Sequence, residues 1–362
     1  MGRYGRAAMS GDLRHIPCKS MEVPRVRQSL ITNFRKVCEA TAIRAAAWNG
    51  RADQVSANAD AMTAVRRGLG AMSMSGHVVL GQRERIEGSE PGSVHDILRR
   101  GEVVGRGGDS LDIAVDPIEG TNLVANNQPN AISAIAFAPR ETLLNAPVER
   151  MYKLACGPAV DPCDIGIDRP AAHNVAAVAR ALDKPVSEVV VCILDRSRHA
   201  DLIREVRETG ARVRLIYDGD VQASLSCAIE GTDVDMLVGE GGGPEGVLAC
   251  AGLKALGGFF QGRFHFTEPG ERDAAAAVCD FDVDGIINMD EIVRTNDIHF
   301  VATGITDGEM LSGVRRGRDG SVTTESLVMS SVEHTTTFVR TLYRSGSFGT
   351  DVSEPGLHDS IF

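Results

Sequence analysis

The sequence of 362 residues has no unbroken run of about eighteen apolar residues, the length that a helix needs to cross a bilayer, so we expect no membrane partner. Its eight cysteines include no Cys-x-x-Cys pair and no paired spacing with histidine, which argues against a zinc site. No segment repeats with a period of roughly 20 to 50 residues, so a solenoid is excluded. The formal net charge of −11 argues against a general nucleic-acid binder, because affinity for a phosphate backbone needs clustered Lys and Arg.

The N-terminal segment is basic, with Arg3, Arg6 and Arg14 among its charges, but it lacks the apolar stretch of a signal peptide. We therefore expect residues 1–25 to form a flexible arm of a cytoplasmic protein, and residues 344–362 to form a tail. The chain as a whole is 43% hydrophobic and long enough for one large core or two joined cores.

The most informative segment is Asp-Ile-Ala-Val-Asp-Pro-Ile-Glu-Gly-Thr at 112–121, an apolar strand that stops at a proline before an acid, a glycine and a hydroxyl. Asp116 and Glu119 offer hard oxygen donors of the kind that Mg²⁺ and Mn²⁺ prefer. Gly120 lets the backbone approach a phosphate, and Thr121 can orient an attacking water. Asp-x-x-Glu alone more often caps a helix, but the preceding strand and the proline favour a site that breaks a phosphate ester.

Other polar groups also follow predicted strands. Glu245 follows a glycine run and opens a predicted helix, where a phosphate or sugar can reach backbone amides; a tight turn with an acid favoured by the helix dipole is the alternative. Asp218 and Asp220 can accept hydrogen bonds from sugar hydroxyls or cap a helix. Arg196 and Arg198 suit a phosphate because their forked donors match its oxygens, although such pairs are more often solvated surface.

Helical and strand patterns alternate along the chain, which predicts an α/β protein with sheets between helical layers. An amphipathic pattern at 27–48 predicts a long helix, and the apolar run at 189–194 predicts a buried strand. A turn-rich stretch around 161–169 suggests a boundary. It would separate an N-terminal metal-binding half, 26–165, from a C-terminal sugar-phosphate-binding half, 166–343.

The segment 116–121 resembles the signature of the metal-dependent, lithium-sensitive sugar phosphatases. Further segments are similar, in the same order, to motifs of class II fructose-1,6-bisphosphatase: Asp-Arg-Ser-Arg-His at 195–199, Asp-Gly-Asp at 218–220, Gly-Gly-Pro-Glu-Gly at 242–246 and Ala-Thr-Gly-Ile-Thr-Asp-Gly at 302–308. The resemblance runs from about Leu30 to about Tyr343. Asn-Leu-Val at 122–124 also looks like the cyanobacterial enzymes that accept both fructose and sedoheptulose bisphosphates.

The resemblance implies a layered α-β-α-β-α sugar-phosphatase sandwich. It implies an enzyme that hydrolyses the 1-phosphate of fructose 1,6-bisphosphate to fructose 6-phosphate, in gluconeogenesis or Calvin-type carbon metabolism. Sedoheptulose 1,7-bisphosphate is the alternative substrate. The implied cofactor is Mn²⁺ or Mg²⁺, and the implied assembly is a homo-oligomer, either a dimer or a tetramer.

Position by position, the resemblance also implies the site residues. The implied metal ligands are Asp53, Gln82, Asp116, Glu119 and Glu245. The implied catalytic residues are Thr121 and Glu84. The implied substrate-binding residues are Glu119, Gly120, Thr121, Arg150, Arg196, Ser197, Arg198, Asp218, Gly219, Asp220 and Gly242.

Several positions depart from the family pattern. Gln82 replaces a glutamate of the family's Gly-Glu-Gly-Glu and Ile86 replaces an expected acid, so we expect weaker metal affinity, because a neutral carbonyl does not offset cation charge. Ser197 replaces a proline in the arginine loop, and Arg150 aligns with a phosphate-binding tyrosine. These changes keep a second hypothesis open, in which the chain is a catalytically impaired relative that binds sugar phosphates as a sensor or partner subunit.

Overall fold

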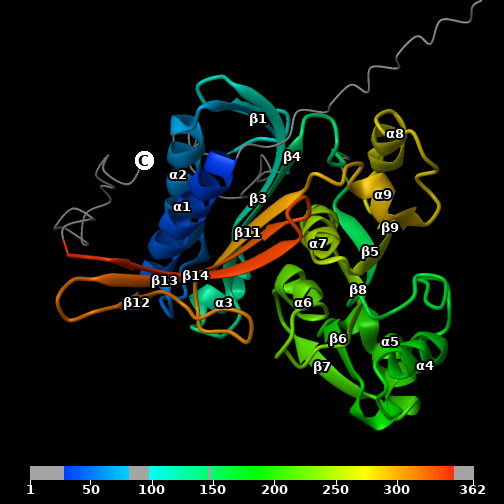
Figure 1. Ribbon diagram of the computed structural model, residues 1–362. Coiled ribbons are helices and arrows are strands. Elements are labelled where there is room, and N and C mark those ends of the chain that lie inside the picture. The colour runs from blue at the N-terminus through cyan, green and yellow to red at the C-terminus, as the bar shows by residue number, and fades with distance from the viewer. Residues whose placement is uncertain (1–27, 81–97, 146–147, 346–362) are drawn as a thin grey trace, which may run out of the picture.

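The computed structural model describes residues 28–80, 98–145 and 148–345. Within these residues the chain forms an eight-stranded sheet and a six-stranded sheet, with helices outside and between them (Figure 1). This arrangement confirms the expected α/β fold, and its layers follow the α-β-α-β-α order. Among the described helices, none combines the length and the apolar character needed to cross a membrane.

The large sheet has the strand order β12-β13-β11-β4-β3-β1-β2, with β14 paired to β13. Its strands are β1 (Met74–Leu80), β2 (Val103–Val104), β3 (Asp109–Glu119), β4 (Ile132–Pro139), β11 (His299–Gly304), β12 (Arg315–Arg316), β13 (Val322–Ser330) and β14 (Thr335–Tyr343). The central strands β4 and β11 are buried along their whole length, as expected for strands covered on both faces.

Helices α1 (Gln28–Ala45) and α2 (Gln54–Ala71) cover the outer face of the large sheet. The stacked rings of Phe34 and Phe137 lie in the core between α1 and the sheet. Glu39 of α1 is fully buried, and its carboxylate accepts hydrogen bonds at 2.6 Å from the hydroxyl groups of Thr341 and Tyr343. The first helix and the last strand of the described chain are thus joined by one polar cluster.

The small sheet has the order β10-β9-β5-β8-β6-β7. Its strands are β5 (Arg150–Cys156), β6 (Val190–Leu194), β7 (Arg212–Ile216), β8 (Met236–Gly242), β9 (Phe259–His265) and β10 (Ile287–Asn288). Helices α4 (Ala171–Ala181) and α5 (Ala200–Glu208) cover its outer face.

Helices α6 (Asp220–Ser226) and α7 (Gly243–Leu256) form the middle layer (Figure 1). Helix α7 contacts β5 and β9 of the small sheet and β4 and β11 of the large one. Apart from Glu245 and Lys254, its side chains are small or apolar on every face, as expected of a helix buried between two sheets. The remaining helices are short: α3 (Thr121–Ala125), α8 (Glu271–Ala276) and α9 (Met289–Ile292).

The chain crosses between the sheets twice. Strand β5 belongs to the small sheet although it precedes residue 165, and strands β11 to β14 return to the large sheet at the end of the chain. A division at residues 165 and 166 therefore does not separate one sheet from the other. The predicted arm and all but two residues of the predicted tail lie outside the described residues.

Candidate active site

A cavity of about 580 Å³ lies where the end of β3 and the start of α3 meet β5, β6 and β8 and the first turns of α6 and α7. Both sheets and the middle layer contribute to its wall. Residues from the acidic motif at 116–121, the arginine motif at 195–199 and the glycine run at 241–244 line this one space. The fold thus brings together segments that are far apart in the sequence.

A bulge at the end of β3 turns the two acids of the motif into this cavity. Asp116 lies opposite Ala134 and Glu119 opposite Ile132, so the two residues between the acids face only one on β4. Pro117 is one of these two residues and cannot donate to the ladder because it has no N–H. Asp116 and Glu119 therefore both line the cavity instead of pointing to opposite faces of the strand.

The loop after β3 connects these acids to the middle layer. Gly120 has φ 92°, a left-handed conformation that favours glycine, and begins α3. The Thr121 hydroxyl donates to the carbonyl oxygen of Ile118 at 3.2 Å. Glu119 Oε1 accepts from the backbone N–H of Val221 at 2.9 Å, so an acid of the large sheet holds the first turn of α6.

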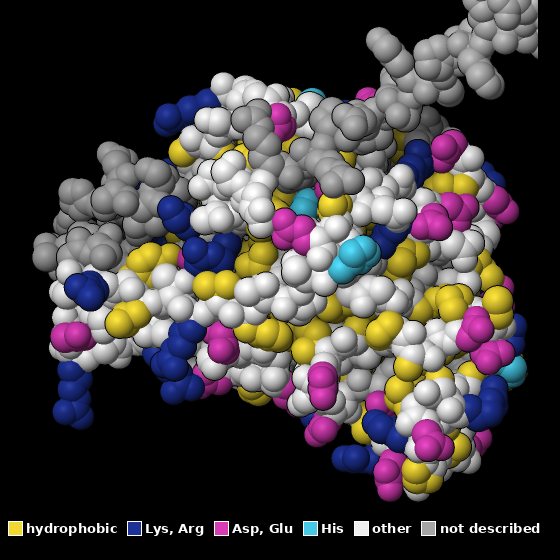
Figure 2. Space-filling model, in the orientation of Figure 1, with side chains coloured by type: hydrophobic (Ala, Val, Ile, Leu, Met, Phe, Trp, Pro, Cys, Tyr) yellow, Lys and Arg dark blue, Asp and Glu magenta, His cyan; other side chains and the backbone are white. Residues whose placement is uncertain are grey.

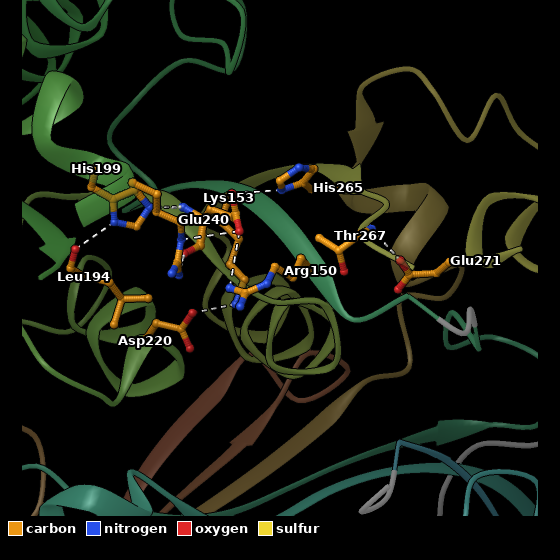
Figure 3. Close-up of polar contacts among 10 residues, drawn as sticks. Arg150, Lys153, Leu194, His199, Asp220, Glu240, His265, Thr267 and Glu271 are labelled. Carbon is orange, nitrogen blue, oxygen red and sulfur yellow. Dashed lines mark hydrogen bonds and ion pairs between the residues drawn. The ribbon is translucent and has the colours of Figure 1, made fainter. Parts of the chain in front are cut away.

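Asp220, in the same turn of α6, forms an ion pair with Lys153 of β5 at 2.6 Å (Figure 3). The side chain of Lys153 is 1% exposed. Gly241 leaves room for this pair, because a Cβ at that position would lie 2.0 Å from Asp220 Oδ2. Lys153 is not among the site residues predicted from the sequence, although a lysine between the apolar residues of the segment 150–156 could have indicated a buried charge.

Glu245 lies in the first turn of α7 and lines the same cavity. A Cβ on Gly242 would lie 1.8 Å from Glu245 Oε2, so this glycine makes room for the carboxylate. The partial positive charge at the helix N-terminus favours an acid here. The glycine run and the acid are thus parts of one local structure.

The acids raise one another's affinity for protons. Burial and the nearby Glu245 raise the pKa of Asp116 to about 8. Burial, and then Asp220, raise the pKa of Glu119 well above its usual range. Burial also raises the pKa of Glu245, while the charge of Lys153 opposes that change. The buried acids therefore favour their protonated forms, and a cation that binds here would have to displace those protons.

Arg150, Arg196 and Arg198 also line the cavity. Arg196 donates to the carbonyl oxygens of Asp195 and Tyr217, at 2.9 and 2.5 Å. Arg198 donates to the backbone oxygen of Glu240 at 2.7 Å. Backbone carbonyls thus hold two of the three guanidinium groups predicted to bind a phosphate.

His199, next to these arginines, is held in a neutral form. Its Nε2 accepts from the backbone N–H of Glu240 at 2.8 Å, so the ring proton lies on Nδ1, which donates to the carbonyl oxygen of Leu194 at 2.7 Å (Figure 3). Burial lowers its pKa further. His199 therefore orients the start of α5 and the strand β8.

Some predicted residues lie elsewhere. Asp53 caps α2, where its side chain accepts from the N–H of Ser56 at 2.9 Å, and it does not line the cavity. Ser197 is exposed to solvent. Gln82 and Glu84 lie outside the described residues.

The carboxylates of the cavity suit a divalent cation, because they can carry the opposite charge and because some of their oxygens accept no hydrogen bond from the described residues. Glu119 Oε2 and Glu245 Oε2 are buried and have no hydrogen-bond partner among the described residues. Within the same part of the chain, no three carboxylate, imidazole or thiol side chains are placed so that they could hold a metal ion together. The described acids thus provide part of a coordination shell, and its remaining donors must come from elsewhere.

On the face drawn in Figure 2, Lys and Arg side chains are interspersed with Asp and Glu. The lining of the cavity likewise carries both signs of charge, with three arginines beside five acids.

The layered α/β fold and its acidic cavity define a protein of the sugar-phosphatase type. A family model described as "Bacterial fructose-1,6-bisphosphatase, glpX-encoded" matches residues 28–343. The chain belongs to this family, whose members are metal-dependent phosphatases.

Curated relatives give the same result. A Prochlorococcus marinus (strain MIT 9303) protein is 37% identical over 330 residues, covering 87% of this chain and 96% of the relative. A Synechococcus sp. (strain JA-2-3B'a(2-13)) protein is 38% identical over 332 residues, covering 85% and 93%. Both are named D-fructose 1,6-bisphosphatase class 2/sedoheptulose 1,7-bisphosphatase.

Proposed function

We propose that the protein hydrolyses the 1-phosphate of fructose 1,6-bisphosphate, giving fructose 6-phosphate and inorganic phosphate. The observation that carries this proposal is a single cavity lined by both carboxylates and three arginines. The acids suit a cation that binds the reacting phosphate, and the arginines suit a second phosphate at the far end of the same sugar. A bisphosphate uses both sets of groups, whereas a monophosphate leaves one set unpaired.

Sedoheptulose 1,7-bisphosphate is the second candidate substrate, and the names of the relatives support it. The two sugars carry phosphates at both ends and differ by one carbon. Sugar hydroxyls would bind Asp218, Gly219 and Asp220. The backbone at Gly120 and Gly242 would permit close approach of the substrate.

We assign the proposed cation, Mg²⁺ or Mn²⁺, to Asp116, Glu119 and Glu245, with Asp53 and Gln82 completing the set; because no three of the described acids are placed to hold an ion together, these side chains must move closer when it binds. When bound, such a cation lowers the pKa of a water and neutralises phosphoryl oxygens. The protein's own groups then position the reactants. Asp53 can act as a ligand only if α2 moves. Otherwise the missing donors must come from the segment 81–97, which contains Gln82.

In the reaction, the water oxygen bonds to phosphorus while the bond from phosphorus to the C1 oxygen breaks. The C1 oxygen leaves with a proton. We assign the orientation of the water to the Thr121 hydroxyl and the catalytic carboxylate to Glu84. Arg150, Arg196 and Arg198, with the loop at Ser197, would hold the distal phosphate throughout.

Phosphate release tests the proposal directly. Purified protein is assayed with each bisphosphate in the presence of Mg²⁺ or Mn²⁺, and Asp116→Asn serves as the inactive control. Release that the parent and the control share would contradict the assignment of this cavity. No release by the parent, with ligand binding retained, would support the impaired relative; replacing Gln82→Glu and Ile86→Asp together should then raise activity.

We also propose a cytoplasmic homo-oligomer, a dimer or a tetramer, from the resemblance stated above. Light scattering coupled to size-exclusion chromatography measures the mass. A monomer at micromolar concentration would contradict this part of the proposal.

A further inference from the structure

Two of the arginines that line the cavity, Arg150 and Arg198, flank one buried carboxylate, that of Glu240 in β8. Its side chain is 4% exposed and lies behind the cavity wall, which it does not itself line. Glu240 Oε1 lies 3.4 Å from Arg150 Nη1 and 3.4 Å from Arg198 Nε. Its Oε2 lies 3.0 Å from Nδ1 of His265 (Figure 3). One acid thus contacts three groups that carry or can carry positive charge.

The two arginines depend on this carboxylate to different degrees. Arg198 also donates to the backbone oxygen of Glu240, a contact that survives any change of the side chain. The side chain of Arg150 is 43% exposed, and its ion pair with Glu240 is the contact that draws it toward Arg198. Without the carboxylate, Arg150 would be repelled by Arg198 and could turn toward solvent.

The need for such a carboxylate follows from a position at which this sequence departs from the family pattern. The family resemblance places a neutral tyrosine at the position of Arg150. A tyrosine beside Arg196 and Arg198 requires no counter-charge, whereas a third guanidinium does, because like charges at short range oppose one another. Arg150 and Glu240 are directly linked, although they are 90 residues apart in the chain.

We propose that Glu240 is a positioning residue that holds Arg150 beside Arg198, so that together they form the subsite for the distal phosphate. This inference rests on the proposed bisphosphate substrate. Glu240 itself touches neither the substrate nor the reacting atoms. The carboxylate leaves the outward N–H groups of Arg150 and Arg198 able to bind one phosphate. Because the two side chains are already held together, the entropy cost of ordering them on phosphate binding is lower.

The test uses ligands that separate the two ends of the substrate. Fructose 6-phosphate carries only the distal phosphate, and its binding is measured by calorimetry without added cation. Glu240→Ala should weaken that binding about tenfold, and Glu240→Gln, which keeps the volume, should weaken it less. In turnover, Glu240→Ala should raise KM for fructose 1,6-bisphosphate with little change in kcat. It should leave kcat/KM for fructose 1-phosphate within about twofold of the parent.

A double-mutant cycle tests whether Arg150 and Glu240 act as a unit. Arg150→Ala and the double variant Arg150→Ala with Glu240→Ala should bind fructose 6-phosphate equally weakly, because Glu240 acts through Arg150. Asp235→Asn is the matched control. Asp235 directly precedes the same strand and pairs with Lys184 at 2.7 Å, outside the cavity, so its loss should lower stability and leave the binding unchanged.

Binding of fructose 6-phosphate to Glu240→Ala as tight as to the parent, or tighter, would overturn the inference, as would fully additive effects of the two substitutions. Equal losses with fructose 1,6-bisphosphate and fructose 1-phosphate would also overturn it, since they would indicate a general structural defect. A failure of the proposed function itself gives a different result: the parent protein would bind fructose 6-phosphate but release no phosphate from the bisphosphate.

Discussion

At the residue scale, the acids of the cavity are buried and only partly paired. Burial raises the pKa of Asp116, Glu119 and Glu245; the charge of Glu245 adds to the shift of Asp116, and the charge of Asp116 adds to that of Glu119. Two of their oxygens have no donor among the described residues. Lys153 pairs with Asp220 instead. These raised pKa values make the stability of the protein depend on pH and on divalent cations.

Without a divalent cation, we expect the free energy of unfolding to fall as pH rises from about 4 to about 8. Asp116 has a pKa of about 8 in the folded protein and about 3.9 when unfolded, so between these values the folded state keeps a proton that the unfolded state has released. Urea unfolding in chelator at several pH values measures the slope. Asp116→Asn should flatten it, and Mn²⁺ should restore stability most at the upper end. An equal slope in the variant would contradict this account.

A second prediction concerns Thr121. If its hydroxyl orients the attacking water, Thr121→Val should lower kcat by about 10- to 100-fold with a small change in KM, whereas Thr121→Ser should keep most of the activity. Steady-state phosphate release measures both constants. A kcat for Thr121→Val close to that of Thr121→Ser would exclude a role for the hydroxyl.

At the element scale, the connection from β8 to α7 works because glycines leave room for carboxylates. A Cβ on Gly241 would lie 2.0 Å from Asp220 Oδ2 and 3.0 Å from Lys153 Nζ, and neither of these groups is at the surface. The middle layer can therefore approach the small sheet only where side chains are missing. The run at 241–243 is thus a packing requirement as well as a place for a ligand.

We expect Gly241→Ala to lower the free energy of unfolding by about 1–3 kcal/mol, because the added methyl overpacks a buried ion pair. It should also weaken sugar-phosphate binding by displacing Asp220. Gly70→Ala is the control: a Cβ there meets no atom within 4 Å, and alanine in a helix should add about 0.5–1 kcal/mol. Denaturant unfolding measures both, and equal stabilities of the two variants would contradict the packing argument.

At the scale of the whole molecule, the two ends of the described chain are joined on the outer side of the large sheet. Glu39 in α1 accepts hydrogen bonds from Thr341 and Tyr343, residues 302 and 304 positions away, and from Arg35. The last strands of the described chain, β13 and β14, thus contact its first helix. This cluster lies away from the cavity that carries the proposed activity.

Glu39→Ala should accordingly lower the free energy of unfolding by about 2–4 kcal/mol, because several buried donors lose their acceptor. The kcat measured well below the unfolding temperature should stay within about twofold of the parent. Tyr343→Phe, which removes one of the donors, should cost less. A loss of kcat without a loss of stability would show that the two faces of the large sheet are coupled.

Much of the fold was predictable from local pattern. The predicted helix at 27–48 corresponds to α1 and the short 3₁₀ turn that follows it, and the apolar run at 189–194 corresponds to β6. Strands β5, β9, β13 and β14 were not predicted. Strands paired to distant partners carry weaker local signals than amphipathic helices, because their stability comes from the sheet.

The sequence by itself determined the chemistry available at each strand end. Pro117 imposes the bulge and the glycines at 120 and 241–243 allow close approach, and both effects are properties of the local backbone. Only the tertiary structure decided which acids share a cavity, that Lys153 pairs with Asp220 across 67 residues, and that Glu240 lies between Arg150 and Arg198. Charge interactions depend on distance in space, and the sheet pairings that set those distances are made between segments far apart in the chain.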